Sequence, residues 1–476
     1  MSRIRSAALG FASLMTLAAC TVGPDFRAPA TPSTSAAAFV GSASPVVNTA
    51  EPDTDWWRLY NDPVLDALIA DAFAANTDLR IATANLARAR AVLRETRAGR
   101  LPETTIGAGA SYGRVPSEQR APGAPTEDWS FDAGINISYE LDLFGRVTRS
   151  IEASNADADA VAAARDAVRV AVAAETARAY ADAASAAERL AVAERTVALI
   201  DQTLNLTTKR YEAGRGTRLD VARVTSLRDQ QRAALPPLRA ERDGALFRLA
   251  TLTGRAPAEL PTQAGARRTT LRLDQPIPVG DGRALLARRP DIREAERRLA
   301  AETARIGVAT ADLYPRISFG GSIGSTGSSI GDMFGGGPLR WLVGSLLSWS
   351  FPNQEANRAR IEQAEATTQA ALASFDGTVL RALEETETAL SRYANELDRR
   401  TALTAAREQA ELAARIERAR LREGKTDSLA VLDAERTLAT AEADLALSDA
   451  RVATAQVDLF RALGGGWQEA RPAQTG

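Results

Sequence analysis

The chain has 476 residues and a formal net charge of −2, with 58 basic side chains against 60 acidic ones. This balance leaves no excess of positive charge to neutralise phosphates, so a nucleic-acid partner is not expected. The sequence contains no histidine, which excludes Ser-His-Asp and Cys-His catalysis and histidine-based zinc sites. Chemistry based on carboxylates passes this filter, but the sequence shows no arrangement of residues that would carry it, so we expect no enzyme, no catalytic residue, no bound metal and no cofactor.

The N-terminus has the pattern of a secretory signal. Two arginines precede an uncharged stretch from Ala7 to Ala18, which is too short to span a bilayer as a helix. The sequence Leu-Ala-Ala-Cys then ends at Cys20 and resembles the bacterial lipobox. We predict that residues 1–19 are removed as a lipoprotein signal peptide and that Cys20 is acylated, for example with palmitate. Thr21 follows in place of an aspartate, which favours the outer membrane. The alternative is an ordinary signal site with an incidental cysteine.

The mature sequence contains the same order of elements twice, offset by about 210 residues, which indicates a duplicated unit. Asn76–Arg80 matches Arg289–Arg293, and Arg210–Gly214 matches Arg420–Gly424. The expected organisation is a lipid-anchored segment with part of an equatorial belt (20–66), a first repeat (67–254), an equatorial linker (255–290), a second repeat (291–464) and a C-terminal tail (465–476).

Each repeat begins with a helix and continues with a pair of strands. The pairs are expected at about 102–114 and 128–143, and at about 315–325 and 339–352. From Trp129 to Leu141 apolar and polar residues alternate without a break, which is typical of a strand with two different faces.

Aromatic residues recur on these strands. Trp341 and Trp349 would stand about 26 Å apart on an extended strand, close to the height of an outer-membrane apolar band. We therefore expect Tyr112, Trp129, Trp341 and Trp349 at the membrane interface. A soluble sheet with one wet face shows the same alternation and is the alternative.

Four strands are too few to close a barrel, and lipid does not tolerate open sheet edges. If the strands lie in a membrane, several chains must contribute to one barrel. Hydrogen bonding alone thus predicts an oligomer.

Each strand pair is followed by a long alanine-rich run without proline, from about 147 to 212 and from about 355 to 423. A helix of this length is a rod of about 100 Å. The rods end at Gly214 and Gly424, and returning helices are expected to run to Gly254 and Gly464. The hairpin tips then lie near 210–220 and 420–430. A helical hairpin that only spaces two ends apart is the alternative interpretation.

With these features the chain resembles the TolC-type outer-membrane efflux proteins, in particular the NodT-like lipoprotein branch. The segments that carry the resemblance are Cys20–Phe26, the stretch from Arg289–Arg293 to Leu313–Pro315, and Gly424 with Leu432–Arg436. The resemblance covers essentially the whole mature chain. It implies a mainly α fold with a membrane β-barrel portion: a homotrimer whose twelve-stranded β-barrel continues into a twelve-helix periplasmic α-barrel.

The resemblance also implies a gate at the periplasmic tips. Asp433 matches a pore-lining aspartate, Arg436 lies one turn later as a partner, and Asp220 matches the acidic gate position of the first repeat. The chain departs from the family's pattern where a second aspartate, a tyrosine and an arginine are replaced by Ala430, Leu421 and Thr426. A solvated helix face is the alternative for both aspartates.

The function implied is a passive exit duct in the outer membrane of a Gram-negative bacterium. Its partners would be a periplasmic adaptor protein, an inner-membrane efflux pump and outer-membrane lipid through the acyl chains, and the duct would open when the helix tips splay apart. An exit duct for a secreted polypeptide and a non-conducting structural lipoprotein are the alternatives.

Overall fold

The computed structural model describes residues 21–30, 37–114, 116, 118, 120, 122–123, 125–335 and 339–466. Cys20, the predicted signal peptide and most of the predicted C-terminal tail lie outside these residues. The helices are α2 (Pro63–Ala75), α3 (Thr77–Ala98), α4 (Arg146–Glu212), α5 (Arg218–Ala233), α6 (Leu235–Leu252), α7 (Gly282–Arg288), α8 (Pro290–Ala311), α9 (Glu355–Arg422) and α10 (Ser428–Ala462). The strands are β1 (Val47–Asn48), β2 (Glu103–Arg114), β3 (Glu127–Leu141), β4 (Ile277–Pro278), β5 (Arg316–Gly327) and β6 (Leu339–Ser348).

The described residues form two compact units. The first, here called the strand unit, comprises residues 21–29, Leu86–Val161 and Glu294–Phe375. The second, here called the hairpin unit, comprises residues 30, 37–85, Ala162–Arg293 and 376–466. Both repeats contribute to each unit, so the two units do not correspond to the two repeats.

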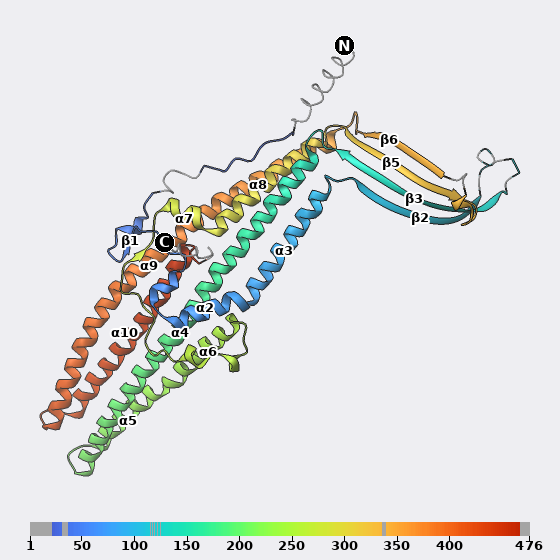
Figure 1. Cartoon of the computed structure of the whole chain (residues 1–476). Helices are drawn as coiled ribbons and strands as arrows, with labels where there is room; N and C mark the ends of the chain where they lie inside the picture. Colours follow the sequence, from blue (N-terminus) through green and yellow to red (C-terminus); the bar gives the residue numbers. More distant parts are fainter. Residues whose placement is uncertain are drawn as a thin grey trace, which may run out of the picture. The chain divides into compact units, whose positions relative to one another are not determined.

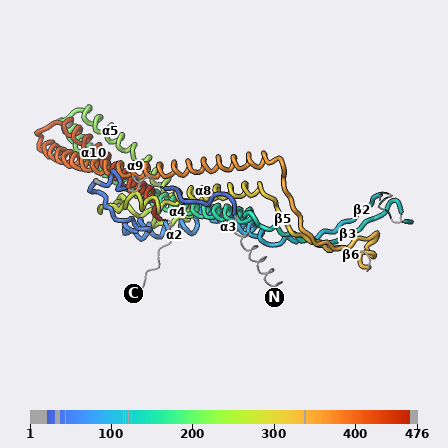
Figure 2. The backbone as a smooth tube through the Cα atoms, turned by 90° about the horizontal axis from the view of Figure 1, so that it is seen from above, coloured from blue at the N-terminus to red at the C-terminus, as the bar shows by residue number. Residues whose placement is uncertain are grey.

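A four-stranded antiparallel sheet dominates the strand unit. Its order is β2-β3-β5-β6, so the hairpins of the two repeats join through β3 and β5 (Figure 1). The four strands also stay together in the perpendicular view of Figure 2. The register places Ile106, Ile135, Ile323 and Trp341 in one row across the sheet. The alternation read from the sequence therefore produces an apolar row on one face of the sheet.

The helices of the strand unit pack through small and branched side chains. Leu93 of α3 contacts Val147 and Ile151 of α4. Ala156 of α4 packs against alanines of α8, where the small side chains allow two helix backbones to approach closely.

The hairpin unit contains α5, α6, α10 and the distal parts of α4 and α9, and α9 and α10 lie side by side in both views (Figures 1 and 2). Its core surrounds Trp56, which stacks on Phe460 with 4.7 Å between the ring centroids. The sequence predicts a single returning helix in the first repeat, but the structure divides it in two. Helix α5 ends at Ala233, and α6 starts at Leu235. Pro236 and Pro237 explain this break, since proline has no amide hydrogen to donate to the preceding turn.

The duplication is visible where each hairpin ends. Gly254 follows α6 with φ +67°, and a side chain there would meet Ala75, just before α3. Gly464 follows α10 with φ +70°, and a side chain there would meet Arg289, just before α8. Both positions need glycine for the left-handed conformation and for the close approach. None of the helices in the described part of the chain is apolar over a length sufficient to cross a membrane.

Candidate functional site

The tip of the first hairpin is held by a capping box. After α4 the chain turns at Gly214, with φ +72°, and enters α5 through Thr217. The carboxylate of Asp220 accepts hydrogen bonds from the Thr217 backbone at 3.0 Å and from its hydroxyl at 2.7 Å. These bonds from Thr217 lower the pKa of Asp220. Asp220, a predicted gate residue, is therefore engaged in starting its own helix.

The second tip repeats this turn with different contacts. Gly424 has φ +69°, and Asp427 starts α10 by accepting a hydrogen bond from the Ala430 backbone at 2.9 Å. Because Ala430 stands where a carboxylate would complete a capping box, this tip has only half of the arrangement seen at the first. Asp433 and Arg436 both lie exposed on α10, and within the described residues no ion pair joins them.

Sequence reasoning missed a buried contact beside these two residues. Glu435 is 4% exposed, and its Oε1 accepts hydrogen bonds from Nε of Arg418 at 3.0 Å and from Oγ1 of Thr203 at 2.6 Å. Thr203 lies on α4, Arg418 on α9 and Glu435 on α10, so this cluster, here called the hairpin lock, connects the two hairpins. Its only signal in the sequence is a carboxylate at a position that helical spacing assigns to the buried face.

The position where the family pattern has a tyrosine is also buried. Leu421 is 2% exposed, and its carbonyl accepts a hydrogen bond from Nη1 of Arg210 at 2.9 Å. The side chain therefore packs inside the hairpin unit, and a further contact from α4 reaches the end of α9.

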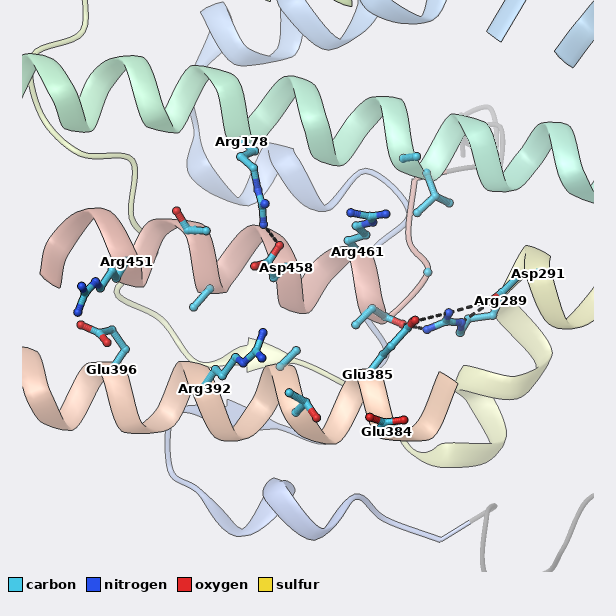
Figure 3. Close-up of a pocket in the computed structure, with 18 of the residues that line it drawn as sticks. Arg178, Arg289, Asp291, Glu384, Glu385, Arg392, Glu396, Arg451, Asp458 and Arg461 are labelled. Atoms are coloured by element: carbon cyan, nitrogen blue, oxygen red, sulfur yellow. Dashed lines mark hydrogen bonds and ion pairs between the residues drawn. The ribbon is translucent and has the colours of Figure 1, made fainter. Parts of the chain in front are cut away.

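A charged groove of about 1130 Å³ lies in the hairpin unit between α4, α9 and α10 (Figure 3). Arg178 pairs with Asp458 across it, and Arg289 pairs with Asp291 at 2.7 Å and with Glu385 at 2.8 Å. Three further arginines in the lining make no ion pair with the described residues. They are Arg392, Arg451 and Arg461.

The groove lies on the polar face of α10. Arg451, Asp458 and Arg461 line it, whereas Phe460 is buried against Trp56 in the core. In total the lining contains six arginines and five carboxylates. They are Arg178, Arg289, Arg392, Arg399, Arg451 and Arg461, and Asp291, Glu384, Glu385, Glu396 and Asp458. The net charge of the groove is thus one positive unit per chain.

The four predicted interface aromatics all lie in the strand unit, and all are exposed in the single chain. Tyr112 and Trp129 are cross-strand partners with ring centroids 5.6 Å apart. Trp341 lies within β6 and is 73% exposed. The second strand of this repeat is shorter than predicted, because β6 ends at Ser348; Trp349 follows it, and its indole donates to the carbonyl of Leu313 at 3.0 Å.

A buried arginine holds the segment Thr21–Phe26, here called the N-terminal strap. The side chain of Arg149 is 5% exposed. It donates to the carbonyl of Val22 at 3.1 Å, to the carbonyl of Gly23 at 3.2 Å and to the carboxylate of Asp25 at 2.8 Å. The sequence linked this segment only to the family resemblance, whereas the structure makes it part of the folded strand unit.

Comparisons with known proteins agree with this architecture. A family model described as outer membrane efflux protein matches residues 68–255 and 282–465. The chain is 33% identical over 474 residues to the outer membrane protein OprJ of Pseudomonas aeruginosa, with 98% of each protein covered. It is 29% identical over 466 residues to the cation efflux system protein CusC of Escherichia coli O157:H7, which covers 97% of this chain and 99% of that protein.

Solved structures give the same result. The outer-membrane channel OprN superposes with a TM-score of 0.87 at 37% identity, covering 94% of this chain and 100% of that one. The open state of the Neisseria gonorrhoeae MtrE channel superposes with a TM-score of 0.83 at 28% identity, covering 94% and 99%. The expected fold class, outer-membrane location and efflux role are confirmed. With its two repeats, its strand sheet and its long hairpins, this chain belongs to the family of TolC-type outer membrane efflux proteins.

Proposed function

We propose that the chain forms a homotrimeric passive duct, through which small molecules from an inner-membrane pump and its periplasmic adaptor protein leave the cell. The observation that carries this proposal is the four-stranded sheet. Within the described residues β2 pairs only with β3 and β6 only with β5, so both edge strands are open. An open edge in hydrocarbon would leave backbone groups without partners, at several kcal/mol each. Three sheets joined edge to edge give twelve strands and leave no edge.

The hairpins support the same stoichiometry. Each chain supplies four helical segments along its hairpins: α4, α5 with α6, α9, and α10. Three chains would supply twelve, enough for a tunnel wall continuous with the barrel. The groove lies on the face of α10 opposite the Trp56 core, and we assign that face to the lumen.

The gate is proposed at the tips. Three copies of Asp433 brought together at a constriction repel one another and favour cations in the pore. Contact with the adaptor and pump would splay the helix ends, a rigid-body rearrangement resisted by the hairpin lock of Thr203, Arg418 and Glu435.

Acylation of Cys20 is proposed as the membrane anchor. Each buried methylene contributes about 0.8 kcal/mol, so two or three acyl chains hold a protein to a membrane without a spanning helix. The lipobox motif before Thr21 is the feature that supports this proposal.

The cargo is proposed to be small molecules as a class. The names of relatives include pyoverdine export, toluene efflux and cation efflux, which are small and chemically diverse cargoes. Such diversity is expected where the pump, and not the duct, selects the cargo.

Single-channel conductance of the purified lipidated protein in a planar bilayer tests the proposal, together with its native mass. A trimeric mass and discrete conductance steps are expected. A channel with a closed tip would show no conductance, so the same recording is made after deletion of the tips around Gly214 and Gly424. The absence of conductance in the tip-deleted protein would favour a non-conducting structural lipoprotein.

A further inference from the structure

The N-terminal strap crosses helix α8 where neither backbone has room for a side chain. Gly23 has φ +88°, and a methyl group on it would stand 2.5 Å from Cα of Gly307. A methyl group on Gly307 would stand 2.8 Å from Cγ of Arg149. Because two glycines and one buried arginine meet at this crossing, the position of the strap is sensitive to single substitutions.

The start of the strap lies beside the turn between β3 and α4. The amide of Val22 donates to the carbonyl of Phe144 at 3.2 Å, and Thr21 packs directly against Gly145. The residue before Thr21 is joined to this anchored position by a single peptide bond, which spans about 3.8 Å between Cα atoms. That residue is Cys20, the proposed site of acylation.

Aromatic rings occupy the same place. Phe144 stacks on Tyr314, with ring centroids 4.5 Å apart, and Tyr314 is 40% exposed. Tyr314 also lines a pocket of about 570 Å³ with Trp349 and Phe351, which stack on each other at 4.8 Å. Tyr314 and Trp349 each combine an apolar ring with a polar group, which is typical of side chains at the headgroup level of a membrane.

We propose that Arg149 is the positioning residue of the lipid anchor: it clamps the strap so that the acylglyceryl group on Cys20 lies against the Phe144–Tyr314 pair. The proposal rests on the proposed acylation of Cys20 and adds a defined place for the lipid. Without the clamp the strap would be a short flexible tether, and the acyl chains could lie anywhere within its reach.

Photo-cross-linking of the acyl chain tests this position. Cells expressing the full chain are grown with a palmitate analogue that carries a diazirine near its carboxyl group, and their outer membranes are irradiated. Mass spectrometry then maps the cross-linked peptides. In the wild type, cross-links should concentrate on the peptides that contain Leu141–Arg146 and Leu313–Arg316.

Two independent substitutions should shift these cross-links to other peptides. Arg149→Gln removes the clamp, and Gly23→Ala pushes the strap off α8 without changing the arginine. Each should reduce cross-linking to the two peptides several-fold, at equal palmitate incorporation and equal trimer yield, whereas Arg149→Lys should retain part of it. Unchanged cross-linking in Gly23→Ala would overturn the proposal even if Arg149→Gln fails to fold.

Matched controls exist in the same unit. Arg298→Gln removes an exposed arginine whose partner is Glu294 on the same helix, and Gly107→Ala adds a methyl group in open space on β2. Both should cross-link like the wild type. If Cys20→Ala incorporates as much analogue as the wild type, the acylation itself is refuted. Incorporation at Cys20 with scattered cross-links, or with cross-links only to a neighbouring protomer, refutes the positioning alone.

Discussion

Arg418 and Glu435 form an ion pair at 3.0 Å, in which the glutamate side chain is 3% exposed and the arginine 28%. The pair joins α9 to α10, and the hydroxyl of Thr203 extends it to α4. Because the carboxylate is buried, removing either partner leaves a polar group without its hydrogen bonds.

We expect Glu435→Ala to destabilise the contact between the hairpins by about 1–3 kcal/mol, less than for a fully buried pair because Arg418 is partly exposed. The melting temperature should fall, and the fraction of time that the channel is open in a planar bilayer should rise. Thr203→Val should cause a smaller change in the same direction.

The control is Glu411→Gln, which removes a half-exposed i,i+4 pair with Arg407 on α9. Pairs of this i,i+4 kind on a helix contribute about 0.3–0.5 kcal/mol, so the melting temperature and the open fraction should both change little. An open fraction in Glu435→Ala equal to that of this control would show that the hairpin lock does not restrain the gate.

The capping box of the first tip predicts a pH dependence. Hydrogen bonds from Thr217 depress the pKa of Asp220 below its ordinary value of 3.8, so the folded state favours the ionised carboxylate. The resulting stability is present above pH 3.8 and is lost as the pH falls through the depressed pKa. Asp220→Asn should reduce protection of the first turn of α5 by about 0.5–1 kcal/mol at neutral pH, measured by hydrogen exchange.

The second tip provides the comparison for this experiment. Asp427→Asn keeps a good N-cap acceptor and loses no capping box, because Ala430 cannot form one. The protection of α10 should therefore stay nearly unchanged. Equal losses at both tips would mean that charge, and not the capping box, holds the Asp220 turn.

Local signals made much of the fold predictable. Period-two alternation fixes the faces of a strand, and glycine at a left-handed position marks the end of a helix, so the sheet and the turns at Gly214 and Gly424 could be read from the sequence. The proline pair after Leu235 carried a comparable signal for the break between α5 and α6, and the prediction of one continuous helix overlooked it.

The contacts between distant segments had no such signal. The side chains of Arg418 and Glu435 are 17 residues apart, and Arg149 lies 124 residues from Asp25. A periodic pattern assigns a residue to a face of its own helix, but not to the residue that faces it. The hairpin lock and the clamp on the strap therefore required the structure.

Asp433 is predicted to set the ion preference of the pore. In Asp433→Ala the permeability ratio of cations to anions, measured from reversal potentials, should fall, because three negative charges leave the constriction. Asp398→Ala, which removes an exposed carboxylate of α9 outside the groove, should leave the ratio unchanged. Identical reversal potentials in the wild type and Asp433→Ala would remove Asp433 from the pore.

The groove between α9 and α10 should act in the opposite sense. Arg392 and Arg451 line it without an ion pair among the described residues, so each adds a positive charge to the wall that we assign to the lumen. Replacing both with glutamine should raise the preference for cations. The shift should be larger at low ionic strength, because the Debye length grows from about 10 Å at 0.1 M salt to about 30 Å at 0.01 M. Arg283→Gln, an exposed arginine of α7 outside the groove, is the matched control. If the double variant and this control gave the same reversal potentials at both salt concentrations, the groove would face away from the conducting path.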